Sequence, residues 1–145
     1  MNRVQRLQPI LRLAALQVEQ AGAQLLRGQQ RLDAENQRLA QLQGYQHEYR
    51  QDLQRIGEGG VTIGRLQLYD GFQQQLEQAV AHQRQMILQA EQQLREVRET
   101  WRQHDMRHKS LQKVLERLQG EADVQQRRSE QRTHDEYARR RRDGG

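Results

Sequence analysis

Two long stretches of this 145-residue sequence carry apolar residues at alternating spacings of three and four, and a glycine-rich segment separates them. An apolar repeat of seven residues places one stripe along a helix, and that stripe must be buried against another helix. The pattern runs from Leu11 to Ile56 in the first stretch and from Leu66 to Leu118 in the second. Because Gly57-Glu58-Gly59-Gly60 permits a reversal of the chain, the two stretches are expected to pair as antiparallel helices. The sequence therefore predicts an all-α fold, an antiparallel coiled-coil hairpin.

The arms of this hairpin are expected to differ in length. We predict a single domain over residues 1–145, with arm one at about 9–56, a turn at 57–60 and arm two at about 61–140. Pro9 marks the expected start of the first helix, since the early amides of a helix have no intrahelical partner. Facing residues have numbers that sum to about 118, so the second arm outruns the first. The residues after Leu118 are therefore predicted to form an unpaired C-terminal extension.

The composition argues against an enclosed active site. Only 34% of the residues are hydrophobic and 4% are aromatic, while about a fifth are Gln. His104 and His108 lie one helical turn apart, as zinc ligands can, but no third ligand accompanies them, so they are expected to fill the seam. There is no cysteine, and no Ser has a plausible His and acid partner. We expect a protein that is not an enzyme and has no catalytic residue, metal or cofactor.

The net charge of +5 suggests an acidic partner. We expect this charge to be spread along both arms, with a concentrated run at Arg139, Arg140, Arg141 and Arg142, for which a solvated tail is the alternative. A basic coiled-coil protein that binds nucleic acid is an alternative function, although acidic residues interrupt the tail and no aromatic platform accompanies it. No apolar run approaches the length of a membrane span, and no signal-type stretch follows the N-terminal arginines. A cytoplasmic protein without membrane insertion is expected.

An aromatic stripe near the turn is the strongest candidate for a binding surface. The heptad positions place half of the stripe in the seam and half on its exposed flank. Clustering of aromatic residues on a chain with so few of them is typical of a partner-binding patch, although the same residues could simply thicken the seam. The stripe comprises Leu42, Tyr45 and Tyr49 on the first arm and Phe72, Leu76, Ala79 and His82 on the second.

These residues also carry a family resemblance. The segment from Tyr45 to Arg50 resembles the Tyr-x-x-Glu-Tyr-Arg signature of the FliJ family of flagellar export proteins. Three further segments are similar to the family pattern, namely Leu68 to Val80, Thr100-Trp101-Arg102 and Asp135-Glu136-Tyr137-Ala138. The chain departs from the family in using Arg where Lys is usual, and His82 lies one residue from the family's histidine.

The resemblance implies a cytoplasmic component of the flagellar type III export apparatus, a stalk-like coiled coil peripherally associated with the inner membrane at the flagellar base. Its implied partners are the hexameric export ATPase, whose assembly and activity it promotes, the cytoplasmic domain of the export gate protein FlhA, and export chaperones. The gate-binding residues of the family map onto the aromatic stripe, namely Leu42, Tyr45, Tyr49, Phe72, Leu76, Ala79 and His82. The run from Arg139 to Arg142 falls in the region that the family associates with the ATPase or chaperones.

Other readings of the same pattern remain open. A stalk homologue of a virulence-type secretion system shares the hairpin, and only the aromatic stripe favours the flagellar branch. A plain structural coiled coil has the same heptads. Those heptads are also equally compatible with a hairpin monomer and an arm-exchanged dimer.

Overall fold

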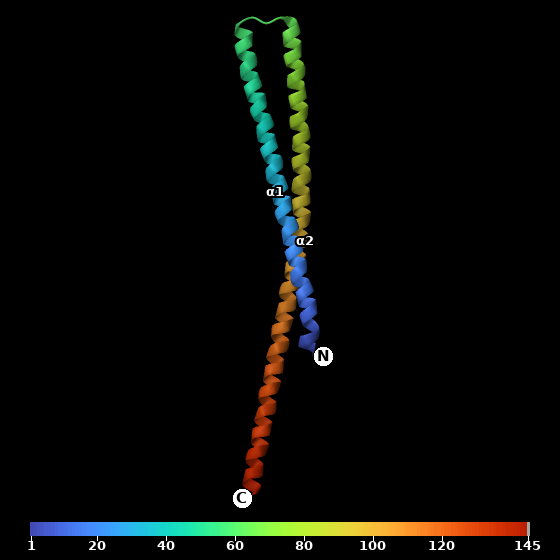
Figure 1. Ribbon diagram of the computed structural model, residues 1–145, viewed down its shortest axis with the longest axis vertical. Helices are drawn as coiled ribbons and strands as arrows, with labels where there is room; N and C mark the ends of the chain where they lie inside the picture. Colours follow the sequence, from blue (N-terminus) through green and yellow to red (C-terminus); the bar gives the residue numbers. More distant parts are fainter. Residues whose placement is uncertain (145) are drawn as a thin grey trace. The chain divides into compact units, whose positions relative to one another are not determined.

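The computed structural model describes residues 1–144 and consists of two helices, α1 (Arg3–Glu58) and α2 (Ile63–Asp143) (Figure 1). Residues 59–62 connect them, and no strand occurs between residues 1 and 144. The helices have 56 and 81 residues and pack against each other, so the predicted all-α antiparallel hairpin with a longer second helix is confirmed.

The first helix begins earlier than the sequence predicted. It starts at Arg3 and runs through Pro9, because Asn2 caps its N-terminus. The Gln5 amide donates to Asn2 Oδ1 at 2.7 Å, and the Asn2 amide donates to Gln5 Oε1 at 3.2 Å. This reciprocal pair is a capping box, which satisfies amides that a helix start leaves free. Pro9 is then tolerated because it lies close to the helix start, where the loss of one hydrogen bond disturbs few turns.

The turn lies slightly later than predicted, at residues 59–62 rather than 57–60. Gly60 has a φ of 84°, a conformation that only glycine adopts readily, and it ends α1. Thr62 caps α2, since its Oγ1 accepts from the Arg65 amide at 3.3 Å. The correction shifts the turn by two residues and leaves the pairing of the arms unchanged.

Contacts divide the described chain into two compact units. The hairpin unit is Ala21–Trp101 and contains the turn, and the terminal unit joins Met1–Gln20 to α2 from Arg102 onward. The core of the hairpin unit is the predicted seam, and each of its buried apolar residues leaves at most 8% of its surface exposed. They are Ala21, Leu76, Val80, Ile87, Ala90 and Leu94.

Large residues face small ones in this seam. A Cβ atom added at Gly28 would meet Val97 Cγ2 at 3.3 Å and Leu94 Cδ1 at 3.4 Å. Gly28 therefore allows α2 to approach α1 closely, as tight packing of two helices requires. Gly22 similarly leaves room for the indole of Trp101, whose Cδ1 lies 3.6 Å from the position of an added Cβ.

One layer of the seam is polar. Glu35 and Gln83 are 5% and 7% exposed, and Gln83 Nε2 donates to the Glu35 carbonyl at 2.9 Å and to its carboxylate at 2.7 Å. Arg38 Nη1 also contacts the Glu35 carboxylate at 3.2 Å. A satisfied polar layer fixes the register of a coiled coil at some cost in stability. The predicted register is observed here, since 35 and 83 sum to 118.

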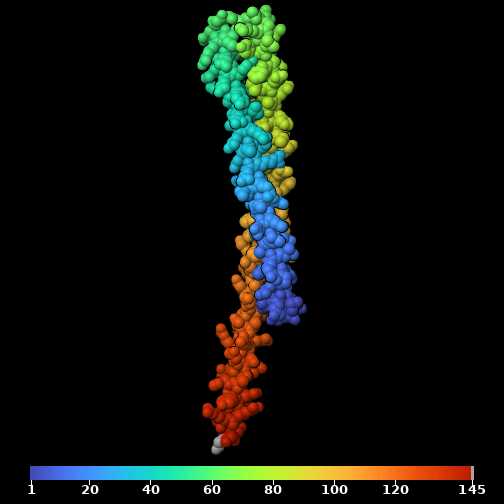
Figure 2. Space-filling model, viewed as in Figure 1, coloured from blue at the N-terminus to red at the C-terminus, as the bar shows by residue number. Residues whose placement is uncertain are grey.

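The terminal unit has its own short seam. Ala14 is buried at 2% exposure, while His104 and His108 are half-buried on the facing side of α2. Beyond Leu118, every residue from 119 to 144 is exposed, and Figure 2 shows these side chains projecting from a single helix. Neither described helix is long and apolar enough to cross a membrane.

Candidate functional site

The centre of the candidate site is a cluster of three aromatic rings near the turn, which we call the tip cluster: Tyr49, Tyr69 and Phe72. The Tyr49 ring lies between the other two, with centroid distances of 5.4 Å to Tyr69 and 4.7 Å to Phe72. Both pairs are tilted, at 50° and 55°, which is a favourable arrangement for aromatic rings. The cluster joins the two helices at a point where aliphatic seam residues are sparse.

A hydrogen bond fixes the central ring. The Tyr49 hydroxyl donates to the Tyr69 carbonyl at 3.1 Å, across the seam from α1 to α2. Partial burial raises the pKa of the Tyr49 hydroxyl above its ordinary value, with a smaller contribution from the neighbouring Tyr69 phenol. Tyr49 is therefore neutral at physiological pH and remains a donor. The ring cannot turn away without losing this hydrogen bond and both ring contacts.

The seven predicted stripe residues, which we call the tip patch, divide into an inner and an outer set. Leu76 is buried at 8% exposure, and Leu42 and Tyr49 are half-buried in the seam. Tyr45 and Phe72 are 58% and 47% exposed. Ala79 is half-buried and His82 is exposed, which completes the patch. The structure thus presents two large aromatic side chains to solvent on a support of packed seam residues.

The ring that contacts Phe72 at 4.7 Å is that of Tyr49. The stripe predicted from the sequence did not include Tyr69, although Tyr69 provides both a ring and a carbonyl to the cluster. The sequence did indicate the position of Tyr69. Facing residues have numbers that sum to about 118, and 49 and 69 sum to 118.

The heptad pattern was wrong at Leu66. This residue occupies a seam position, yet it is 48% exposed, and its neighbours Ile63 and Leu68 are each 75% exposed. Gln46 and Gln73 occupy facing seam positions near the turn, so apolar burial does little to draw the arms together.

The run from Arg139 to Arg142 lies at the end of the exposed extension. Three of these arginines fall in the last turn of α2, where cations interact favourably with the helix dipole. Arg141 Cζ lies 5.8 Å from the centroid of the exposed Tyr137 ring. Pairs four residues apart, such as Gln131 with Asp135 at 3.2 Å, support the helix where no second helix covers it.

The distribution of charge differs from the expectation that the positive charge is spread along both arms and concentrated in the tail. The extension 119–145 has seven basic and six acidic residues, a net charge of only +1. The hairpin unit has nine basic and ten acidic residues, a net charge of −1. Residues 1–20 and 102–118, the paired part of the terminal unit, have eight basic and three acidic residues, a net charge of +5. The excess positive charge therefore belongs to the paired part of the terminal unit.

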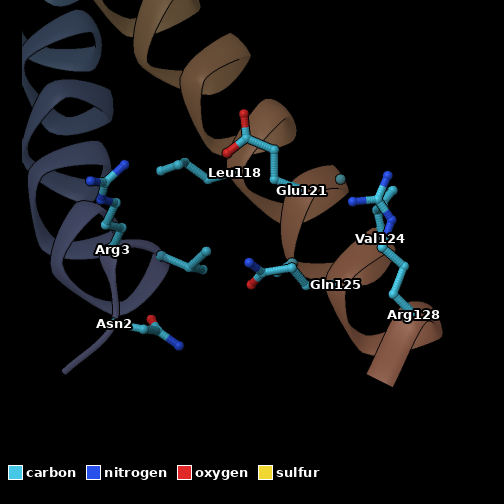
Figure 3. Close-up of a pocket in the computed structure, with 10 residues that line it drawn as sticks. Asn2, Arg3, Leu118, Glu121, Val124, Gln125 and Arg128 are labelled. Atoms are coloured by element: carbon cyan, nitrogen blue, oxygen red, sulfur yellow. The ribbon is translucent and has the colours of Figure 1, made fainter. Parts of the chain in front are cut away.

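A hollow of about 880 Å³ lies in the terminal unit, between the first turn of α1 and the α2 segment from Leu118 to Arg128 (Figure 3). Its lining contains Arg3, Glu121 and Arg128 among apolar and amide side chains, without a His, Ser or Cys. The residues that line it do not form a nucleophile and base pair. No group of three or more His, Cys, Asp or Glu residues suited to a metal ion occurs among residues 1–144.

Comparison with known proteins identifies the family. The model of the flagellar FliJ protein family matches residues 2–142. The chain belongs to the FliJ family. The flagellar FliJ protein of Escherichia coli K12 is 31% identical over 128 residues, which cover 88% of this chain and 87% of that protein. No solved structure matches the chain.

Membership of the FliJ family confirms the resemblance seen in the sequence. It implies a role in flagellar biogenesis and protein export, and association with components of the flagellar export apparatus.

Proposed function

We propose that this protein is a cytoplasmic, non-catalytic stalk of the flagellar type III export apparatus, which binds the export ATPase ring, promotes its assembly and activity, and couples it to the export gate. The observation that carries the proposal is the family match over residues 2–142 together with an exposed aromatic patch on an otherwise polar hairpin. The protein acts in this proposal as a connector, because it offers exposed surfaces for partners along a two-helix hairpin.

The tip patch binds the cytoplasmic domain of the gate protein FlhA in this proposal. Tyr45 and Phe72 are the anchors, since large exposed aromatic side chains contribute most of the energy of many interfaces. Tyr49 supports Phe72 from the seam, where Leu42 and Leu76 also lie, and Ala79 and His82 extend the proposed contact along α2. The tip cluster keeps the surface ordered before binding, which lowers the entropic cost of association.

The terminal unit meets the export ATPase hexamer in this proposal. Its net charge of +5 on residues 1–20 and 102–118 suits an acidic surface and favours rapid association. Arg139, Arg140, Arg141 and Arg142, at the end of the exposed extension, bind the ATPase or an export chaperone. Binding to these partners associates the protein peripherally with the inner membrane at the flagellar base, without insertion.

The test is a titration of the flagellar export ATPase from the same organism with the full-length protein. We expect the hydrolysis rate to rise and rings to form, as followed by light scattering, at near-stoichiometric addition. Replacement of Arg139–Arg142 by Gln should weaken binding of the ATPase or chaperone, whereas Gln at Arg127 and Arg128 on the same exposed helix is the matched control.

An unchanged hydrolysis rate over a wide concentration range, with a competent ATPase, would contradict the stalk function. Steeply salt-dependent binding to DNA or RNA in the same preparation would favour the nucleic-acid alternative instead.

A further inference from the structure

A groove of about 370 Å³ lies near the turn in the hairpin unit, and we call it the side groove. Seven residues from both helices line it, and none of them belongs to the tip patch. They are Leu53 on α1 and Ile63, Leu66, Gln67, Tyr69, Asp70 and Gln73 on α2.

The side groove lies on the opposite flank of the hairpin from the exposed anchors. Leu66, Tyr69 and Gln73 occupy seam positions of the heptad, and Gln67 and Asp70 occupy positions on one side of that seam. Phe72 occupies the flanking position on the other side. A partner that bound both surfaces would therefore contact the hairpin on two opposite flanks.

Tyr69 connects the two surfaces physically. Its ring lies 5.4 Å from that of Tyr49, which in turn contacts Phe72, and Tyr69 also lines the side groove. The tip cluster thus runs through the seam, from the exposed Phe72 on one flank to the groove on the other. Occupation of the groove would bear directly on the rings that hold the tip patch in place.

The residues that line the side groove indicate what kind of group it accepts. Ile63 is 75% exposed and Leu66 is 48% exposed, so an apolar group that covered them would remove a large apolar area from water. Asp70 is the only ionisable carboxylate in the lining, and it is exposed. The complementary ligand is a large apolar side chain with a positive charge beside it.

We propose that the side groove is a second anchor site for the protein that binds the tip patch, and that it receives one Leu, Ile, Met or Phe side chain flanked by a Lys or Arg that pairs with Asp70. This inference rests on the proposed binding of the gate's cytoplasmic domain, because it assigns a further surface to the same partner. A second copy of this chain is a poorer occupant. The side groove is lined by seven residues, whereas a stable interface involves about 20–30 residues on each side, so the groove functions as an extension of a larger contact.

The experiment measures the dissociation constant of the full-length protein for the purified cytoplasmic domain of FlhA, by isothermal titration calorimetry. Leu66→Gln should weaken binding about tenfold, since it removes an apolar anchor surface. Asp70→Asn should weaken binding about threefold and reduce the dependence of the affinity on salt. Leu88→Gln, at a position 56% exposed on α2 and outside both surfaces, is the matched control and should leave binding unchanged.

Circular dichroism of each variant separates binding from folding. Leu66 and Leu88 are similarly exposed, so both Gln variants should keep the helicity and the melting temperature of the wild type.

Two outcomes would overturn the inference, and a third would contradict the proposed function. Wild-type affinity in Leu66→Gln, alongside weakened binding in Phe72→Ala, would remove the side groove from the interface while leaving the tip patch as the gate site. Self-association of the wild type that Leu66→Gln abolished would make a second copy the occupant. No binding of FlhA by the wild type would instead contradict the proposed function on which the inference rests.

Discussion

The middle of the hairpin unit and its tip share one heptad pattern but differ in burial. In the middle, Ile87, Ala90 and Leu94 are 8%, 1% and 6% exposed. Near the turn, Leu66 continues the same column of seam positions and is 48% exposed, and Phe72 is 47% exposed. The same sequence pattern has produced a core in one place and a surface in the other.

The facing residues account for this difference. Leu94 meets Gly28, whose lack of a side chain lets the helices pack closely, and Gln83 donates two hydrogen bonds to Glu35 across the seam. At the tip, Gln46 and Gln73 occupy the seam. The helices are joined there by contacts between aromatic rings rather than by aliphatic side chains. The tightly packed seam therefore lies in the middle of the hairpin, while Leu66 and Phe72 near the turn remain about half exposed.

The largest expected effect is a difference in stability between variants of Leu94 and Leu66, two leucines at the same heptad position. Leu94→Ala should lower the free energy of unfolding by about 3 kcal/mol, because it leaves a cavity in a packed seam. Leu66→Ala should lower it by less than about 1 kcal/mol, since Leu66 is already half exposed. Urea denaturation followed by circular dichroism measures both. Equal losses would mean that the tip is packed as tightly as the middle.

The next effect concerns binding rather than folding. Tyr45→Ala combined with Phe72→Ala should weaken association with the gate's cytoplasmic domain by about 2 kcal/mol or more and leave helicity nearly intact. Calorimetric titration and circular dichroism measure the two quantities, with Leu88→Ala as the control for loss of an exposed apolar residue. Melting of the hairpin in the double variant would show that these rings belong to the core.

The polar layer provides the third prediction. Gln83→Leu should lower the free energy of unfolding by about 2 kcal/mol, because it leaves the buried Glu35 carboxylate with fewer donors. Adding Glu35→Leu should recover that loss, since an apolar layer carries no unsatisfied group. The double variant should also form arm-exchanged oligomers, visible in sedimentation velocity. A double variant that remained a monomeric hairpin would remove the register-fixing role of this layer.

The smallest effect tests the tip cluster itself. Tyr49→Phe should lower the free energy of unfolding by about 1 kcal/mol through loss of the hydrogen bond to the Tyr69 carbonyl. Because folding raises the pKa of Tyr49, the wild type gains this stability below the unfolded-state pKa of about 10 and loses it as the pH rises through the folded-state value. Denaturation series on both proteins measure this, and the variant should be less sensitive to alkaline pH. Identical profiles above pH 10 would mean that Tyr49 is not held in the cluster.

Much of this structure could be predicted from the sequence because seam positions depend on spacing alone. The heptads gave the antiparallel pairing and a facing rule that holds for Glu35 with Gln83 and for Tyr49 with Tyr69. The exposure of Tyr45 and Phe72 also followed from their flanking heptad positions.

The sequence-based predictions were wrong where residue spacing does not determine the structure. The capping box at Asn2 extends α1 through Pro9, which periodicity cannot detect. Leu66 was assigned to the seam because the pattern gives positions around a helix, whereas its exposure depends on the residues that face it across the seam. No motif indicates the side groove, which residues from both helices form.

Hydrogen–deuterium exchange of the full-length protein, alone and with the cytoplasmic domain of FlhA, distinguishes gate binding at the tip patch from gate binding at the terminal unit. We expect slow exchange in the middle of the hairpin unit and faster exchange near the turn in the free protein. Addition of the gate domain should slow exchange at residues 42–82 and leave the extension from 119 to 143 unchanged. Protection confined to the terminal unit, with the tip unaffected, would contradict the assignment of the tip patch as the gate-binding surface.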